Sequence, residues 1–201
     1  SLTASERVEL ISGTNIRIDG DIAHRDGPNK SIGSVVMVAE GQLEAIQRLD
    51  RPGRTETLAR QPGGDLTIQT EGLLADRFEL RAKQNIAIDL NDDLNLTGFI
   101  GGVTGFDQAE NVSITTRGDL IAEGALVAAN QAPVSDSGNG LLTIRAGSIS
   151  GDSSSVFIGD GLNVRSASGI QLNTLVADVL LAETSADMEA DGFASATAAL
   201  R

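Results

Sequence analysis

The amino-acid sequence predicts an all-β protein, a right-handed parallel β-helix (β-solenoid). Three observations predict this fold class. Apolar and polar residues alternate in short runs, which is the pattern of half-buried strands. Glycine or aspartate stands between successive runs, where turns form. The same unit recurs in one orientation roughly every 25 residues, a period within the range of repeat proteins, and parallel strands joined by crossovers wind right-handed.

The repeated unit has an alternating apolar run, a polar turn with glycine or aspartate, and a second alternating run. The units are Ile16–Ile22, Val36–Leu43, Leu66–Leu74, Ile86–Leu96, Val112–Leu120, Leu142–Ile149 and Leu162–Leu172. Their turn residues are Gly20, Gly41, Gly72, Asp92, Gly118, Gly147 and Gly169. Since these residue types tolerate positive φ, we expect them to supply the turn conformation. The alignment predicts about seven coils.

A third apolar patch in several units, such as Phe78–Leu80 and Val156–Ile158, predicts a third strand in each coil. The coils would then form a triangular prism with a core of Val, Ile, Leu and Ala, because the chain has no Trp or Tyr and five Phe. Residues 175–186 fit either a strand or a short helix, and residues 188–193 resemble a weak eighth unit. A β-sandwich is the alternative fold, since it also has short alternating strands. The single orientation of the motif favours stacked coils, which place like residues over like.

The domain prediction is a single β-helix domain over residues 1–201. Both ends carry the repeat pattern without an obvious cap, so we expect a segment of a longer protein. Three insertions, residues 47–64, 98–110 and 130–140, interrupt the repeat. In solenoids such insertions form loops on one side and often carry binding.

Charge and composition exclude several classes of function. The net charge of −13 argues against nucleic acid as a partner, because phosphate binding needs clustered Lys and Arg. No apolar run is long enough for a transmembrane helix. The absence of cysteine excludes a disulfide scaffold and a thiolate metal site.

Two groups of residues are candidates for binding. Arg48, Arg51, Arg54 and Arg60 lie in the first insertion of an otherwise acidic chain. They are a candidate site for an acidic glycan; the alternative is a solvated loop with local salt bridges.

Asp89, Asp92 and Asp93 form the densest carboxylate group and are a candidate calcium site, since calcium takes oxygen ligands. The alternative is that they accept local hydrogen bonds in a turn. The sequence predicts no cofactor other than calcium at this group.

Catalytic residues are not expected. His24 is the sole histidine, so a triad or a His-based metal site would depend on one residue in a turn. The carboxylates could serve a polysaccharide-acting β-helix enzyme, a lyase or a hydrolase. Such an enzyme usually presents aromatic platforms and, for a lyase, a basic residue beside the carboxylates; neither is visible here.

Residues 64–75 and 118–128, with their Gly-Asp-Leu starts and internal Glu-Gly turns, resemble the repeats of filamentous-haemagglutinin-like exoproteins and other large bacterial adhesins. The resemblance covers residues 8–175. It implies a right-handed β-helix, export to the bacterial cell surface, and a role in adhesion or extracellular matrix. The Asn-Pro-Asn motifs of the family's secretion domain are absent, which points to the shaft.

The resemblance therefore implies a structural or adhesive shaft segment of a secreted cell-surface or extracellular-filament protein, not an enzyme. Its expected partners are neighbouring β-helix coils, copies of itself, and glycans or a host surface.

Overall fold

The computed structural model describes most of the chain. The described residues are 2–4, 7–18, 22–24, 34–45, 56–59, 65–74, 78–82, 84–101, 111–129, 140–172, 174–177, 179–185, 188–190, 193–194 and 197–200. Within them the secondary structure is entirely β, with no helix.

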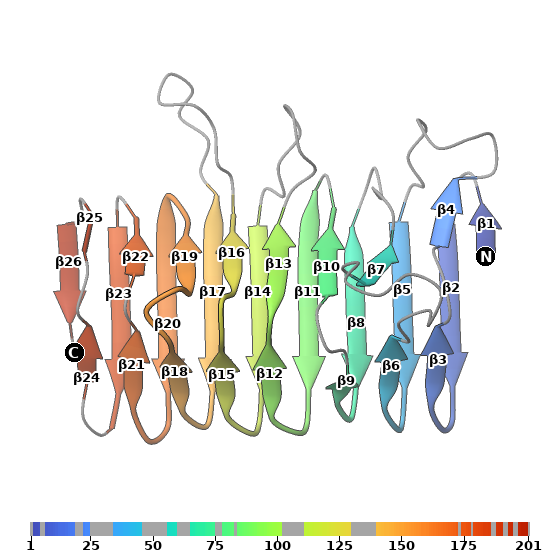
Figure 1. Cartoon of the computed structure of the whole chain (residues 1–201), viewed down its shortest axis with the longest axis horizontal. Helices are drawn as coiled ribbons and strands as arrows, with labels where there is room; N and C mark the ends of the chain where they lie inside the picture. The colour runs from blue at the N-terminus through green and yellow to red at the C-terminus, as the bar shows by residue number, and fades with distance from the viewer. Residues whose placement is uncertain are drawn as a thin grey trace.

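The longest sheet has nine strands that lie side by side along the long axis of the molecule (Figure 1). Its strands, in order, are β2 (Arg7–Ser12), β5 (Ser34–Ala39), β8 (Leu66–Thr70), β11 (Asn85–Leu90), β14 (Asn111–Thr116), β17 (Leu141–Ala146), β20 (Gly161–Ser166), β23 (Val179–Thr184) and β26 (Thr197–Leu200). Each neighbour is the third strand further along the chain, so the chain visits two other sheets before it returns.

Those other sheets hold the shorter strands. A seven-stranded sheet contains β7 (Glu56–Ala59), β10 (Phe78–Arg81), β13 (Gly98–Gly101), β16 (Leu126–Ala128), β19 (Val156–Ile158), β22 (Thr174–Val176) and β25 (Phe193–Ala194). A five-stranded sheet contains β12 (Leu94–Leu96), β15 (Leu120–Ala122), β18 (Ile149–Gly151), β21 (Ile170–Leu172) and β24 (Met188–Ala190). A three-stranded sheet contains β3 (Ile16–Ile18), β6 (Leu43–Ala45) and β9 (Leu73–Leu74), and β1 (Leu2–Ala4) pairs with β4 (Ile22–His24).

Every strand pairing among the described residues is parallel. This confirms the parallel β-helix. The sandwich alternative is wrong, because sandwich sheets are built from antiparallel strands.

Like residues stack over like inside the nine-stranded sheet. Ile88, Ile114 and Ile144 are direct register partners, and each is almost completely buried. The buried residues form one continuous cluster of Val, Ile, Leu and Ala, with Met37 and Phe157 as larger members. Burial of a Val, Leu or Ile side chain contributes about 1.5–3 kcal/mol, so these stacks hold successive coils together.

The strands of the nine-stranded sheet outnumber the coils that the alignment predicted. The alignment placed its first turn at Gly20, which lies outside the described residues, whereas the turn that follows β2 is at residues 13–15. Near the C-terminus, residues 179–184 form strand β23 rather than a helix, in register with β20. The weak eighth unit contributes β24 and β25.

The predicted insertions contain strands. Glu56–Ala59 of the insertion 47–64 forms β7, and Gly98–Gly101 of the insertion 98–110 forms β13. Both join the seven-stranded sheet. Gly140 is described, and the other residues of these two segments and of 130–140 lie outside the described residues.

The turn glycines were expected to supply positive φ, and this prediction is wrong for those that the structure describes. Among the described glycines, only Gly98 and Gly124 have positive φ. Gly118 is required by close approach instead: a Cβ there would lie 2.6 Å from the backbone N of Asp93. The glycine leaves room for the turn of the preceding coil.

No helix in the described part of the chain is long and apolar enough to cross a membrane.

Candidate functional site

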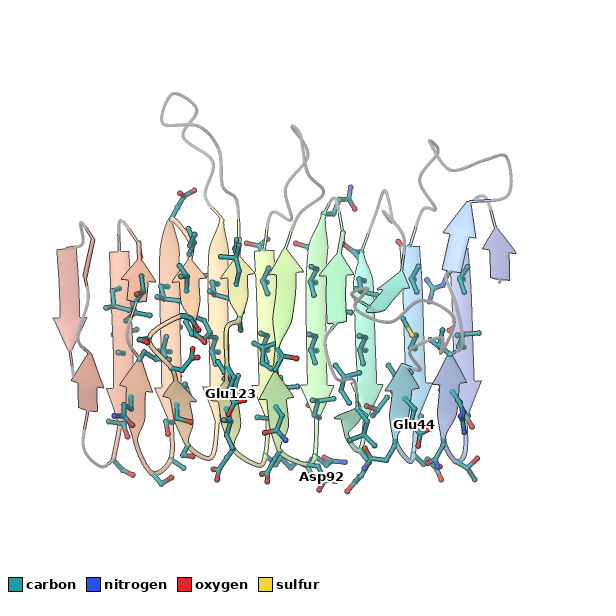
Figure 2. All side chains as sticks on the ribbon, viewed as in Figure 1. Glu44, Asp92 and Glu123 are labelled. Atoms are coloured by element: carbon teal, nitrogen blue, oxygen red, sulfur yellow. The ribbon has the colours of Figure 1, made fainter. Side chains whose placement is uncertain are left out.

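The turns that follow the strands of the nine-stranded sheet lie along one edge of the molecule, here called the turn edge. It comprises residues 13–15, 40–42, 71–72, 91–93, 117–119, 147–148 and 167–169. Figure 2 shows Asp92 at this edge among other polar side chains. Two of the three aspartates of the candidate calcium site, Asp92 and Asp93, therefore belong to it.

Polar side chains at the turn edge bond one coil to the next. The Oδ1 atoms of Asn15, Asp93 and Asp119 accept backbone N–H bonds at 2.9, 2.8 and 2.8 Å. The donors are Gln42, Asp119 and Ser148, respectively. Each acceptor directly precedes the first residue of the next strand along the chain, and that residue is buried. These bonds satisfy turn N–H groups that no sheet ladder reaches.

One bond of the turn edge spans a whole coil. Gln42 Nε2 donates to Asp92 Oδ2 at 3.1 Å, although the turn of Gly72 lies between them in sequence. A Cβ at Gly72 would collide with the Gln42 side chain. The glycine therefore lets the glutamine cross an intervening turn and reach the aspartate.

A second polar row lies where the strands of the nine-stranded sheet begin. Asp65 Oδ1 accepts from Asn85 N and Nδ2 at 3.1 and 2.8 Å. Asn85 Oδ1 accepts from Asn111 Nδ2 at 2.9 Å, and Asn111 Oδ1 accepts from the Leu141 N–H at 3.2 Å. Four successive coils are linked by this row.

Asp152 follows β18, and several hydrogen-bond donors surround its carboxylate. Its carboxylate accepts bonds from the Ser155 and Ser154 hydroxyls at 2.6 and 2.7 Å and from the Gly124 N–H at 3.1 Å. Because each bond favours the charged form, they hold the pKa of Asp152 well below its usual range, with the Ser155 hydroxyl as the largest cause. The Gly124 bond reaches across to the preceding coil.

The Asp152 carboxylate is expected to make the stability of the protein depend on pH. A depressed folded-state pKa means that its contribution is complete above the unfolded value of about 3.9 and is lost as the pH falls toward the folded value. The difference in free energy of unfolding between the wild type and Asp152→Asn should therefore shrink below about pH 4. NMR titration of the Asp152 carboxyl carbon measures the pKa directly.

Ser155→Ala is the companion variant, because it removes the principal hydroxyl donor. It should move the titration of Asp152 up toward the ordinary aspartate value. A wild-type Asp152 that titrates near 3.9 would contradict the argument.

The three aspartates of the candidate calcium site do not converge. Asp89 points outward from β11 and is exposed, while Asp92 and Asp93 accept the turn-edge bonds described above. Throughout the described ranges, no group of three or more His, Cys, Asp or Glu side chains is arranged to hold a metal ion. Asp92 and Asp93 thus lie in a turn, as the alternative predicted, but their carboxylates accept bonds from other coils and not from local groups.

The other sequence candidates lie elsewhere. Arg48, Arg51, Arg54 and Arg60 are outside the described residues. His24 ends strand β4, and its side chain is outside the described set.

The sequence reasoning missed Asn15, Asp119, Asn85 and Asn111. Their signal was present in the sequence: each is a polar residue directly before the apolar residue that starts a buried run.

Comparisons with protein-family models, with curated proteins and with solved structures found no match.

Proposed function

We propose that this chain is a structural or adhesive shaft segment of a secreted cell-surface or extracellular-filament protein. The observation that carries the proposal is the use of polar side chains. The carboxylates and amides of the turn edge and of the Asp65 row bond one coil to the next. These bonds therefore hold neighbouring coils together along the axis of the molecule.

The arrangement suits a load-bearing shaft. Backbone hydrogen bonds of a parallel β-helix run along its axis, so a pull along that axis is shared by the ladders of every sheet at each coil. The side-chain rows add bonds in the same direction, for example Asp119 Oδ1 to the Ser148 N–H at 2.8 Å. The stacked aliphatic core adds apolar burial at every level.

The resemblance of the repeats to filamentous-haemagglutinin-like exoproteins supports placing the shaft outside the cell. The net charge of −13 fits a soluble exposed surface, since a net charge far from zero opposes non-specific association. Glycans or a host surface are the proposed targets of the adhesive role.

Surface labelling tests this proposal. Antibodies raised against the 201-residue chain should label intact cells that make the protein. External protease should remove the label before a cytosolic marker is degraded. Label found solely after the cells are permeabilised would overturn the extracellular shaft.

Turnover assays test the enzymatic alternative. The purified chain, incubated with neutral and acidic polysaccharides, should release neither reducing ends nor unsaturated products. Product formation that is abolished by one carboxylate substitution would replace the shaft with a polysaccharide-acting enzyme.

A further inference from the structure

The outer face of the nine-stranded sheet carries two straight rows of side chains, here called the pairing face. The first row is Glu9, Val36, Thr67, Ala87, Ser113, Thr143, Asn163 and Leu181. The second row is Ile11, Val38, Gln69, Asp89, Thr115, Arg145, Arg165 and Glu183. Every one of these residues is partly or fully exposed.

The first row is dominated by short side chains, which lose little rotamer entropy when they are covered. Its central members are Thr67, Ala87, Ser113 and Thr143. Figure 1 shows the strands beneath the face running side by side, with close to one direction. Such a surface can pack against a second sheet, because sheets pack face to face at about 10 Å when their strands align.

The charges of the second row are separated along the axis. Asp89 and Arg145 flank Thr115 on β14, the middle strand of the nine. With neighbouring strands about 4.8 Å apart, the two charged residues are roughly 10 Å apart, too far to pair with each other. Neither has a hydrogen-bond or ion-pair partner among the described residues.

Arg145 also lies directly beside Arg165, and like charges at paired positions are destabilising. Glu183 relieves one side of this pair, since its Oε2 is 3.1 Å from Arg165 Nε. Arg145 has no such carboxylate partner among the described residues. A carboxylate from another molecule would neutralise its charge.

We propose that the pairing face binds a second copy of this chain, with the two helix axes antiparallel. A two-fold axis that runs parallel to the strands and passes over Thr115 reverses the order of the coils but keeps the rows. Asp89 of each copy then faces Arg145 of the other, and the contact occurs twice, as isologous symmetry requires. Gln69 of each copy faces Arg165 of the other.

The same operation matches the first row. Ala87 faces Thr143 of the second copy, Thr67 faces Asn163, and Val36 faces Leu181. Small residues therefore meet small or medium residues, and the aliphatic side chains of Val36 and Leu181 meet each other. The Asp89–Arg145 contacts are complementary in this arrangement. Glu183, which faces Val38, keeps Arg165 of its own chain as its partner. A parallel arrangement in register would instead set Asp89 against Asp89 and Arg145 against Arg145.

The size of the face is adequate for a stable pair. Nine strands at about 4.8 Å spacing extend for about 38 Å, and six-residue strands are about 20 Å long. The face therefore covers about 750 Å², close to the roughly 800 Å² per partner of a standard interface.

A pair of matched charge reversals tests the proposal. Asp89→Arg alone sets arginine against arginine twice, and Arg145→Asp alone sets aspartate against aspartate twice. Each variant of the 201-residue chain should sediment as a monomer at concentrations where the wild type is a dimer. An equimolar mixture of the two variants should dimerise again, because both contacts between unlike chains then join opposite charges. The double variant should dimerise with itself for the same reason.

Glu123→Arg is the control, since it makes the same change of charge in the turn between β15 and β16, two strands that belong to the other sheets. It should leave the dimer intact. Circular dichroism melting identifies any variant that fails to fold, and the mixture and the double variant keep the test valid in that case.

A wild type that stays monomeric overturns the pairing, and so does a mixture that fails to restore the dimer. A monomeric wild type that binds heparin through Arg145 assigns the face to an acidic glycan instead. The pairing does not depend on the shaft function, so either result leaves surface labelling as a separate test.

Discussion

Replacing Ile114 with alanine is expected to lower the free energy of unfolding by about 2–5 kcal/mol. Ile114 is fully buried in the middle strand of the nine-stranded sheet. It stacks between Ile88 and Ile144, so its truncation removes contacts to both adjacent coils. Because the neighbours are fixed by their own ladders, the cavity cannot close fully. Urea unfolding followed by circular dichroism measures the change.

Ile121→Ala is the matched control. Ile121 belongs to the next strand of the same coil, β15, but points outward and is 37% exposed. The same loss of atoms there should cost less than about 1 kcal/mol. Equal losses at the two positions would mean that the stacked interior is not the main source of stability.

Gly118→Ala should destabilise the protein by about 1–3 kcal/mol through overpacking. Its new Cβ would lie 2.6 Å from the Asp93 backbone N and 2.8 Å from the Asp92 carbonyl carbon. These are backbone atoms of the preceding coil, so the two turns must move apart. The movement would also lengthen the bond from the Asp119 N–H to Asp93 Oδ1. Thermal unfolding detects the loss as a lower Tm.

Gly13→Ala is the control for this substitution. It lies in the turn after β2, and a Cβ there would meet just Glu40 Oε2, at 4.0 Å. The added methyl restricts the unfolded chain, so the variant should be neutral or more stable by about 0.4–1 kcal/mol. If both variants lost stability equally, backbone propensity rather than the approach of neighbouring coils would explain the glycines.

The fold could be predicted from the sequence because the pattern repeats in one orientation, which favours stacked coils over a sandwich. Alternation with period two defines strands, and repetition in one orientation defines parallel stacking, as at Ile88, Ile114 and Ile144. The ends were predicted less well. There the pattern weakens, and residues 179–184 became a strand because the edge of β20 offered backbone partners that periodicity does not reveal.

The candidate site was predicted in part. The aspartates at 92 and 93 were correctly expected in a turn, but their partners lie 50 and 26 residues away, and only the winding brings them close. Pairs such as Asp65 and Asn85 depend on the same winding.

The sequence by itself determined most of the strands, the apolar face of each and the repeated turns, because these follow from local periodicity. Only the tertiary structure showed which turns of neighbouring coils lie against each other. It thereby showed why Gly118 must lack a side chain. It also decided that Asp89 and Arg145 share one outer row, on either side of Thr115. The physical reason is register: residues far apart in the chain become neighbours at one strand spacing only after the coils stack.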